Sequence, residues 1–362
     1  MRLSKKSAAL LLAALFVFGA ACSKTPLPAS PSSGGGVGRT DVQSDTGESS
    51  DTTETRDTSD TSDTSETSDT KGTETEQVID DSSELKPGEI KWSIKDGKYV
   101  YEIAPRDDSG MATVSEMYTY STAYYEDQPQ DWYFGKTEYN EATGEVTYVW
   151  ERNAAVLESV KKYGGIYRGD ETRKVAYLTF DCGYEYGVTD DMLDTLKAKN
   201  CPGIFFVTGY YVKSEPGLVM RMFDEGHLVG NHTVNHKRMT QVDVDTFISE
   251  LNGLEEAVKS VNPDAPPMRY YRPPSGNSNE WTFKLADKMG YKTVMWSYAY
   301  YDYDTENQLP VDEAFQKLKT ALHPGVVYLL HTESATNAAL LGDLIDWIRA
   351  QGYELLPICD ID

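Results

Sequence analysis

Seven apolar runs of strand length recur along the last half of the chain, and helical stretches separate most of them. Runs without polar interruption are typical of parallel strands that are covered on both faces. Several helical stretches end in glycine just before the next run, as helix C-termini prefer. The runs are residues 175–180, 203–209, 227–232, 269–273, 293–299, 326–332 and 353–358.

This alternation of strand and helix predicts an α/β domain over residues 166–362. About seven such units favour a distorted (β/α)7-type barrel of parallel strands over an open sheet. A small β-rich region is expected before it, at residues 87–165, because short runs rich in Tyr, Trp and Thr are separated by Asp-Gly and Thr-Gly turns. Residues 153–165 predict a short helix that ends at a pair of glycines.

The first residues read as an export signal. Residues 1–22 begin with a basic stretch, continue with an apolar core and finish with small residues before Cys22. A cysteine in this place resembles a bacterial lipoprotein signal, so Cys22 is the expected site of a lipid anchor. The alternative is an ordinary cleaved signal peptide. We therefore expect an exported, extracytoplasmic protein that is attached to the membrane by lipid.

Residues 23–86 have the composition of a disordered linker rich in Ser, Thr and Asp. Residues 41–84 hold 15 Asp or Glu against 2 Lys or Arg, which gives −13 of the chain's net charge of −24. With almost nothing apolar to bury, this segment should remain an extended tether. No basic patch is visible in the sequence, which argues against a nucleic-acid partner.

Residues that can bind a metal or transfer a proton gather at the carboxyl ends of the predicted strands, where parallel α/β folds place their functional sites. They come from five different runs and should meet at one mouth of the barrel. The candidates in chain order are Asp181, Cys182, His232, His236, Arg272, Asp302 and His331.

Two histidines four residues apart, His232 and His236, would face one side of a helix and could share a metal ion. Cys182 offers a third ligand, and a Cys–His–His set with an open position is typical of catalytic zinc. The alternative for Cys182 is a small buried thiol without a ligand role. If Cys201 and Cys359 form a disulfide, Cys182 is left unpaired.

Three further residues fit acid–base chemistry beside such a metal. Asp181 is placed to take a proton from water, and Arg272 could keep it ionised through a paired hydrogen bond. His331 ends an apolar strand and could protonate a leaving amine. A buried core histidine is the alternative for His331.

Four motifs together resemble the polysaccharide deacetylases of carbohydrate esterase family 4, the NodB-like deacetylases. The motifs are TFDCG at 179–183, HTVNH at 232–236, RPPSG at 272–276 and YLLH at 328–331. The resemblance covers about residues 166–362. It implies a distorted barrel, a divalent metal such as zinc, and removal of acetyl groups from N-acetylated sugars. It also implies Asp181 as base, residue 182 with both histidines as metal ligands, Arg272 as support and His331 as acid.

Longer stretches such as GIYRGDETRKVAYLTFDCGYE and YYRPPSG are similar to the delta-lactam-biosynthetic de-N-acetylases, which act on N-acetylmuramic acid in peptidoglycan, notably of the spore cortex. Two positions depart from the wider family. Cys182 stands where most members have Asp. In the fourth motif, Ala299 and Tyr303 stand where an Asp and a Trp are typical, with Asp302 between them.

The sequence therefore predicts a monomeric hydrolase that deacetylates N-acetylmuramic acid residues of peptidoglycan glycan strands. A backbone N–H near Ser275 is expected to stabilise the oxyanion. The side chains expected to line the sugar site are Tyr184, Ser275, Trp296, Asp302 and Tyr303. Two alternatives stay open: a deacetylase of chitooligosaccharide, peptidoglycan N-acetylglucosamine or xylan, and a cell-wall-binding protein without activity.

Overall fold

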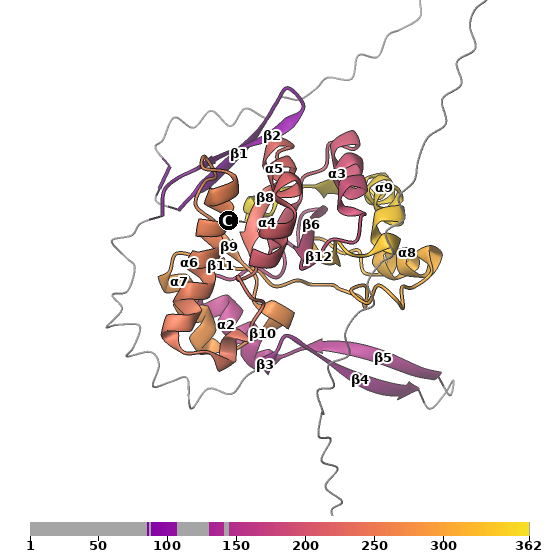
Figure 1. Cartoon of the computed structure of the whole chain (residues 1–362). Coiled ribbons are helices and arrows are strands. Elements are labelled where there is room, and N and C mark those ends of the chain that lie inside the picture. Colours follow the sequence, from indigo (N-terminus) through magenta and orange to yellow (C-terminus); the bar gives the residue numbers. More distant parts are fainter. Residues whose placement is uncertain (1–84, 87, 107–129, 141–144, 362) are drawn as a thin grey trace, which may run out of the picture. The chain divides into compact units, whose positions relative to one another are not determined.

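A sheet of parallel strands forms the centre of the chain in the computed structural model (Figure 1). The structure describes residues 85–86, 88–106, 130–140 and 145–361. The predicted signal peptide with Cys22, nearly all of the predicted linker and part of the β-rich region lie outside these residues. No helix among the described segments has the length and apolar character needed to cross a membrane.

The sheet runs in the order β11-β9-β8-β7-β6-β12, with β13 paired to the start of β6. All of these pairs are parallel, as the apolar runs predicted. The strands are β6 (Val175–Cys182), β7 (Ile204–Val207), β8 (Leu228–Asn231), β9 (Tyr270–Tyr271), β11 (Lys292–Thr293), β12 (Val326–His331) and β13 (Glu354–Leu355).

The sheet curls because the chain after β11 returns to β12. Tyr298 and Tyr328 form a parallel bridge there, and the backbone N–H of Leu329 donates to the carbonyl of Tyr298 at 2.9 Å. A second bridge joins Ile166 to Val294 beside β11. These contacts confirm the predicted distorted (β/α)7-type barrel.

Helices surround the strands, and each buries one apolar face. They are α2 (Ala154–Lys162), α3 (Thr189–Ala198), α4 (Gly209–Ser214), α5 (Pro216–Asp224), α6 (Val244–Val261), α7 (Glu280–Lys288), α8 (Val311–Thr320) and α9 (Ala335–Ala350). In the part of the chain that the structure describes, 3-10 helices accompany them at Met239–Gln241, Pro274–Gly276 and Ile358–Ile361. The sequence pattern did not predict α4, which begins within the run read as a strand over residues 203–209.

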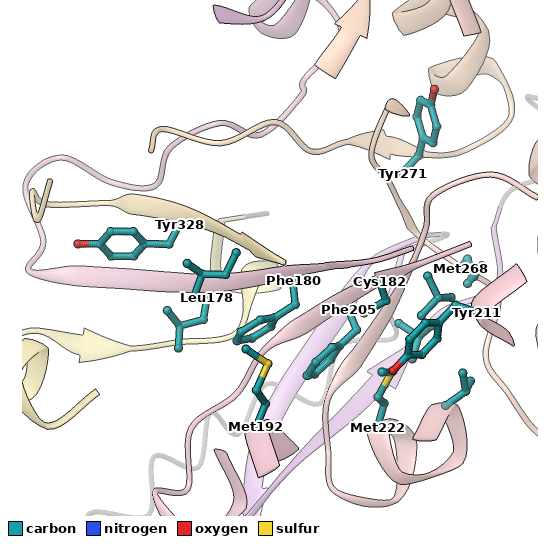
Figure 2. Packing of buried hydrophobic residues seen from close by; sticks show 14 of the residues in the cluster. Leu178, Phe180, Cys182, Met192, Phe205, Tyr211, Met222, Met268, Tyr271 and Tyr328 are labelled. Carbon is teal, nitrogen blue, oxygen red and sulfur yellow. The ribbon is translucent and has the colours of Figure 1, made fainter. Parts of the chain in front are cut away.

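Side chains alternate along β6 between two hydrophobic clusters. Leu178, Phe180 and Cys182 belong to the outer cluster, under the helices, whereas Tyr177 belongs to the inner cluster with Phe206 of β7. Figure 2 shows Cys182 in the outer cluster near Phe205. Because successive residues of a strand point to opposite faces, Asp181 lies on the inner face.

The β-rich region consists of short antiparallel pairs. Strands β1 (Ile90–Lys95) and β2 (Lys98–Ile103) join through Asp96-Gly97, both at positive φ, as a tight hairpin turn requires. Strands β4 (Tyr133–Asn140) and β5 (Glu145–Arg152) form a second pair, and β3 (Gln130–Asp131) pairs with β10 (Asn277–Ser278).

Side-chain contacts attach this region to the barrel, in addition to the pairing of β3 with β10. The indole N–H of Trp132 donates to the carbonyl of Trp296 at 2.9 Å, and Arg106 forms an ion pair with Glu255 at 2.7 Å. Cys182, Cys201 and Cys359 are all buried and none of them is in a disulfide, so the disulfide considered from the sequence is not formed.

The turn before β12 depends on a close approach of two glycines. Gly325 has φ of +75°, and a Cβ there would lie 2.6 Å from the carbonyl carbon and oxygen of Gly169. We expect Gly325→Ala to lower the free energy of unfolding by about 2 kcal/mol or more, through backbone strain and this clash. Denaturant unfolding measures the change.

Gly217→Ala is the matched control, because Gly217 lies exposed in α5 with no atom within 4 Å of an added Cβ. That substitution should be neutral or stabilise by up to about 1 kcal/mol. Equal losses in the two variants would contradict the account of the turn.

Candidate active site

A buried ion pair lies inside the barrel at the carboxyl ends of the strands. Arg272, just after β9, is 0% exposed, and its Nη1 lies 2.7 Å from Oδ1 of Asp181 on β6. The other two guanidinium nitrogens, Nε and Nη2, donate to Thr179 Oγ1 and to the backbone carbonyls of Val294 and Met295 at 2.8–3.2 Å. The structure thus brings Arg272 to Asp181 as the sequence analysis expected.

The charge state of Asp181 follows from its neighbours. Burial alone would raise the pKa of this carboxyl, but Arg272, His232 and His331 outweigh burial and lower the pKa below its ordinary value. Asp181 is therefore an ionised carboxylate at neutral pH. Its Oδ1 is engaged by Arg272, and its Oδ2 lies 3.5 Å from Nε2 of His232.

His232 and His236 lie in a loop after β8 and not on a helix, so the helical spacing expected for them is wrong. Thr233 and His236 have positive φ angles of 67° and 51°, which are strained for residues with a Cβ. Hydrogen bonds from Thr233 N to Asn231 Oδ1 and from His236 N to Thr233 Oγ1, both 2.9 Å, hold the loop. The loop brings the two imidazole rings to 4.9 Å between centroids.

Both imidazoles are neutral at neutral pH. Burial lowers the pKa of His232 to about 4 and also lowers that of His236. The Nδ1–H of His232 donates to the carbonyl of Arg272 at 2.8 Å, which leaves Nε2 with a free lone pair on the side of Asp181. A neutral imidazole oriented through its other nitrogen is the form that ligates metals. The pair fits a divalent cation.

Cys182 does not join this pair. Its side chain is 0% exposed in the outer hydrophobic cluster, and burial raises the pKa of the thiol well above its usual value. Within the described residues, no group of three His, Cys, Asp or Glu side chains is arranged to hold a metal. The expected Cys–His–His set is therefore not assembled, because Asp181 and Cys182 are adjacent on a strand and face opposite sides.

Asp302 was expected to line the sugar site, but the structure corrects this: its carboxylate is buried and hydrogen-bonded to His331. Asp302 is 1% exposed, and its Oδ1 accepts from Nδ1 of His331 at 2.7 Å. Its Oδ2 accepts from the His331 backbone N–H at 2.9 Å and from the amide of Asn337 at 2.6 Å. The acid that the fourth motif seemed to lack is thus supplied by Asp302. Asn337, on α9, was not predicted, since its sequence context indicates only an early turn of a helix.

The carboxylate changes the protonation of His331. Burial lowers the pKa of this imidazole, but the charge and hydrogen bond of Asp302, with smaller effects of Asp181 and Glu333, raise it to about 9. Glu333 is a further residue that the sequence did not indicate. Burial raises the pKa of its carboxyl to about 7. At neutral pH His331 is an imidazolium whose Nε2–H is free to act.

The remaining predicted sugar-site residues divide between surface and core. Tyr184 and Tyr303 are 58% and 52% exposed, and the Tyr303 ring lies 5.5 Å from that of His331. Ser275 is exposed in the turn after Arg272, at φ of 57°. Trp296 is 8% exposed in the inner hydrophobic cluster, so the structure places it in the core.

Comparison with known proteins identifies the class of this site. The sequence model of the polysaccharide deacetylase family matches residues 168–294. The chain is 41% identical over 202 residues to the peptidoglycan-N-acetylmuramic acid deacetylase PdaA of Bacillus subtilis, covering 56% of this chain and 76% of PdaA. It is 32% identical over 212 residues to a chitooligosaccharide deacetylase of Bradyrhizobium, covering 55% and 93%.

The solved structure of Bacillus subtilis PdaA, described as a family 4 carbohydrate esterase, superposes with a TM-score of 0.58 at 37% identity. The match covers 65% of this chain and 97% of that structure.

We expect Asp302→Asn to return the pKa of His331 from about 9 to its ordinary value of 6.5 or below, because burial then acts without the carboxylate. NMR titration of the imidazole measures this directly. The raised pKa contributes stability that is fully present below pH 6.5 and is lost as pH rises through about 9. The variant should lose that contribution.

Asp304→Asn is the matched control, since Asp304 is two residues away but bonds to Asn307 and not to His331. An unchanged His331 titration in Asp302→Asn would show that Asp302 does not set this pKa.

Proposed function

Because the chain belongs to the polysaccharide deacetylase family, we propose that it hydrolyses the N-acetyl group of N-acetylmuramic acid residues in peptidoglycan. The observation that carries the proposal is the pairing of a lowered and a raised pKa on adjacent strands. Asp181 and His331 are register partners on β6 and β12. At neutral pH one is a carboxylate and the other an imidazolium, which is the arrangement of a base and an acid acting together.

The chain's own residues divide the reaction between them. Asp181 takes a proton from water as the water oxygen attacks the acetamide carbonyl, and Arg272 holds the carboxylate in place. His331 then donates its Nε2 proton to the nitrogen as the C–N bond breaks, which releases a free amine and acetate. We propose that a backbone N–H near the exposed turn at Ser275 stabilises the oxyanion.

His232 and His236 would hold the divalent metal that deacetylases of this family use. When bound, such a metal polarises the carbonyl and makes water more acidic. Zinc is the proposed ion because neutral imidazoles suit it. Cys182 is left out of the ligand set, since its side chain lies in the outer cluster.

A deacetylase of peptidoglycan works outside the cytoplasmic membrane. Attachment through a lipidated Cys22, with residues 23–86 as tether and a monomeric catalytic part, completes the proposal. The higher identity to the muramic acid deacetylase than to the chitooligosaccharide deacetylase, 41% against 32%, supports the choice of substrate.

Acetate release from peptidoglycan, from chitooligosaccharide and from acetylated xylan tests the reaction. We expect release from peptidoglycan, and a loss of at least about 100-fold in Asp181→Asn, because the base is gone while the shape is kept. Asp346→Asn, which changes an exposed carboxylate on α9 that pairs with Lys199, should keep full activity. Binding of peptidoglycan without any acetate release would overturn the enzymatic proposal in favour of a cell-wall-binding protein.

Zinc titration by calorimetry tests the ligand set. We expect His236→Ala to weaken zinc binding by at least about tenfold, since one of the two imidazoles is lost. Cys182→Ala should leave the affinity unchanged, because the thiol faces the outer cluster. A loss of affinity in Cys182→Ala equal to that in His236→Ala would return the thiolate to the ligand set.

A further inference from the structure

A cavity of about 320 Å³ lies between the β1–β2 hairpin and the barrel, next to α5 and the start of β8 (Figure 1). Its volume is toward the lower end of the roughly 300–1,000 Å³ that is typical of small-molecule sites. His227 and Leu228 line it at the amino end of β8, whereas His232 follows the carboxyl end of that strand. The cavity is therefore separate from the candidate active site.

Close contacts fix the hairpin over this end of the barrel. The hydroxyl of Tyr101 donates to the carbonyl of Gly226, 125 residues away in the sequence, at 3.2 Å. Gly226 has φ of +79°, and a Cβ there would lie 2.5 Å from the carbonyl oxygen of Tyr99. The cavity is thus preformed, with largely apolar walls. The apolar side chains that line it include Ile90, Tyr99, Tyr101, Phe223, Pro266 and Tyr270.

His227 brings an unpaired polar group to this cavity. Its side chain is 4% exposed, and neither ring nitrogen has a hydrogen-bond partner among the residues that the structure describes. Burial lowers the pKa of His227 to about 4, so the ring is neutral at neutral pH and offers one N–H and one lone pair. Buried polar groups without a partner are rare because they are costly, and such a group beside a cavity indicates a ligand.

Arg269 adds a positive charge to the same cavity. One of its terminal nitrogens donates to the carbonyl of Gly290, but its buried Nε–H has no partner within the described part of the chain. The other charged side chains that line the cavity are Lys98 and Asp224. Two cationic side chains thus face one carboxylate, and the lining favours an anion.

We propose that this cavity is a second ligand site, which binds an organic carboxylate with an apolar aromatic or aliphatic body. The carboxylate accepts hydrogen bonds from a ring N–H of His227 and from the Nε–H of Arg269, and the body packs on the apolar walls. An anion meets both unpaired donors and the positive charge, whereas a cation would be repelled by Arg269. The ligand is a free acid or the carboxyl terminus of a peptide, which share this chemistry.

Titration of the full chain with 3-phenylpropionate tests the site. We expect a saturable shift of the His227 imidazole resonances in NMR spectra, because a ring N–H gains an acceptor. The neutral 3-phenylpropanamide should bind at least about tenfold more weakly, since the charge-assisted hydrogen bonds are lost. The absence of a saturable shift, or equal binding of the acid and the amide, would overturn the inference.

N-acetyl-phenylalanine separates the two sources of the carboxylate, because it carries the same ring on a peptide-like carboxyl terminus. Tighter binding of N-acetyl-phenylalanine than of 3-phenylpropionate would support the site and assign it to peptide termini. Tighter binding of 3-phenylpropionate would support the site and assign it to free acids.

Two independent substitutions test the proposed partners by calorimetry. Arg269→Leu and His227→Phe should each raise the dissociation constant of 3-phenylpropionate at least about tenfold. His227→Phe keeps a ring against Phe205, which His227 contacts at 5.3 Å, and removes both ring nitrogens. Unchanged affinity in either folded variant would contradict the role given to that side chain, and unchanged affinity in both would overturn the site.

Arg349→Leu is the matched control. The Arg349 guanidinium also donates to backbone carbonyls, at 2.7 and 3.0 Å, but it does not line the cavity. This variant should bind 3-phenylpropionate as the wild-type protein does, and a loss equal to that in Arg269→Leu would overturn the inference. None of these measurements uses acetate release, so their outcome is independent of the proposed function.

Discussion

The buried pair of Arg272 and Asp181 is the interaction on which the rest of the site depends. Removing two charges from water costs several kcal/mol for each ion unless every polar atom is paired. Here the guanidinium reaches Asp181, Thr179 and two backbone carbonyls, and it lies over the Phe206 ring at 4.2 Å. One side chain therefore ties β6 to β9 and to the segment after β11. The position of the proposed base and the interior of the barrel are set by the same hydrogen bonds.

A second buried carboxylate produces the opposite effect one strand away. The Asp302 carboxylate accepts hydrogen bonds from Nδ1 and from the backbone N–H of His331. The side-chain amide of Asn337 donates to the same carboxylate and fixes its position. Asp181 and His331 then reinforce each other, since the carboxylate helps to raise the pKa of the imidazole and the imidazolium helps to lower that of the carboxyl. Burial alone would bring the two pKa values closer, but the neighbouring charges drive them apart, so both working protonation states coexist near neutral pH.

The parts of the site that lie on strands could be predicted from the repeating pattern of apolar residues in the sequence. The parts that lie on irregular loops could not. Continuous apolar runs indicated the parallel strands and placed Asp181, Arg272 and His331 at one mouth. The alternation of side chains along a strand also implies that Cys182 faces away from Asp181. The prediction of Cys182 as a metal ligand did not take this alternation into account. Asp302 lies in the irregular segment before α8, where no periodicity shows which side chain turns inward. The strained turn that brings His236 to His232 has a positive φ at Thr233. Threonine does not favour positive φ, so the sequence does not indicate this turn.

That strained loop also explains how two imidazoles can be positioned without a third protein ligand. Thr233 is β-branched, so its positive φ is costly and persists only if surrounding contacts enforce it. Asn231 holds its backbone N–H, and Glu250 of α6 holds the backbone and side chain of Asn235 at 2.8 Å. The rings are therefore oriented by hydrogen bonds from β8 and α6, independently of residue 182. The outer cluster, not the proposed metal site, then constrains that position. A small thiol meets this constraint, whereas a carboxylate would be buried among apolar side chains.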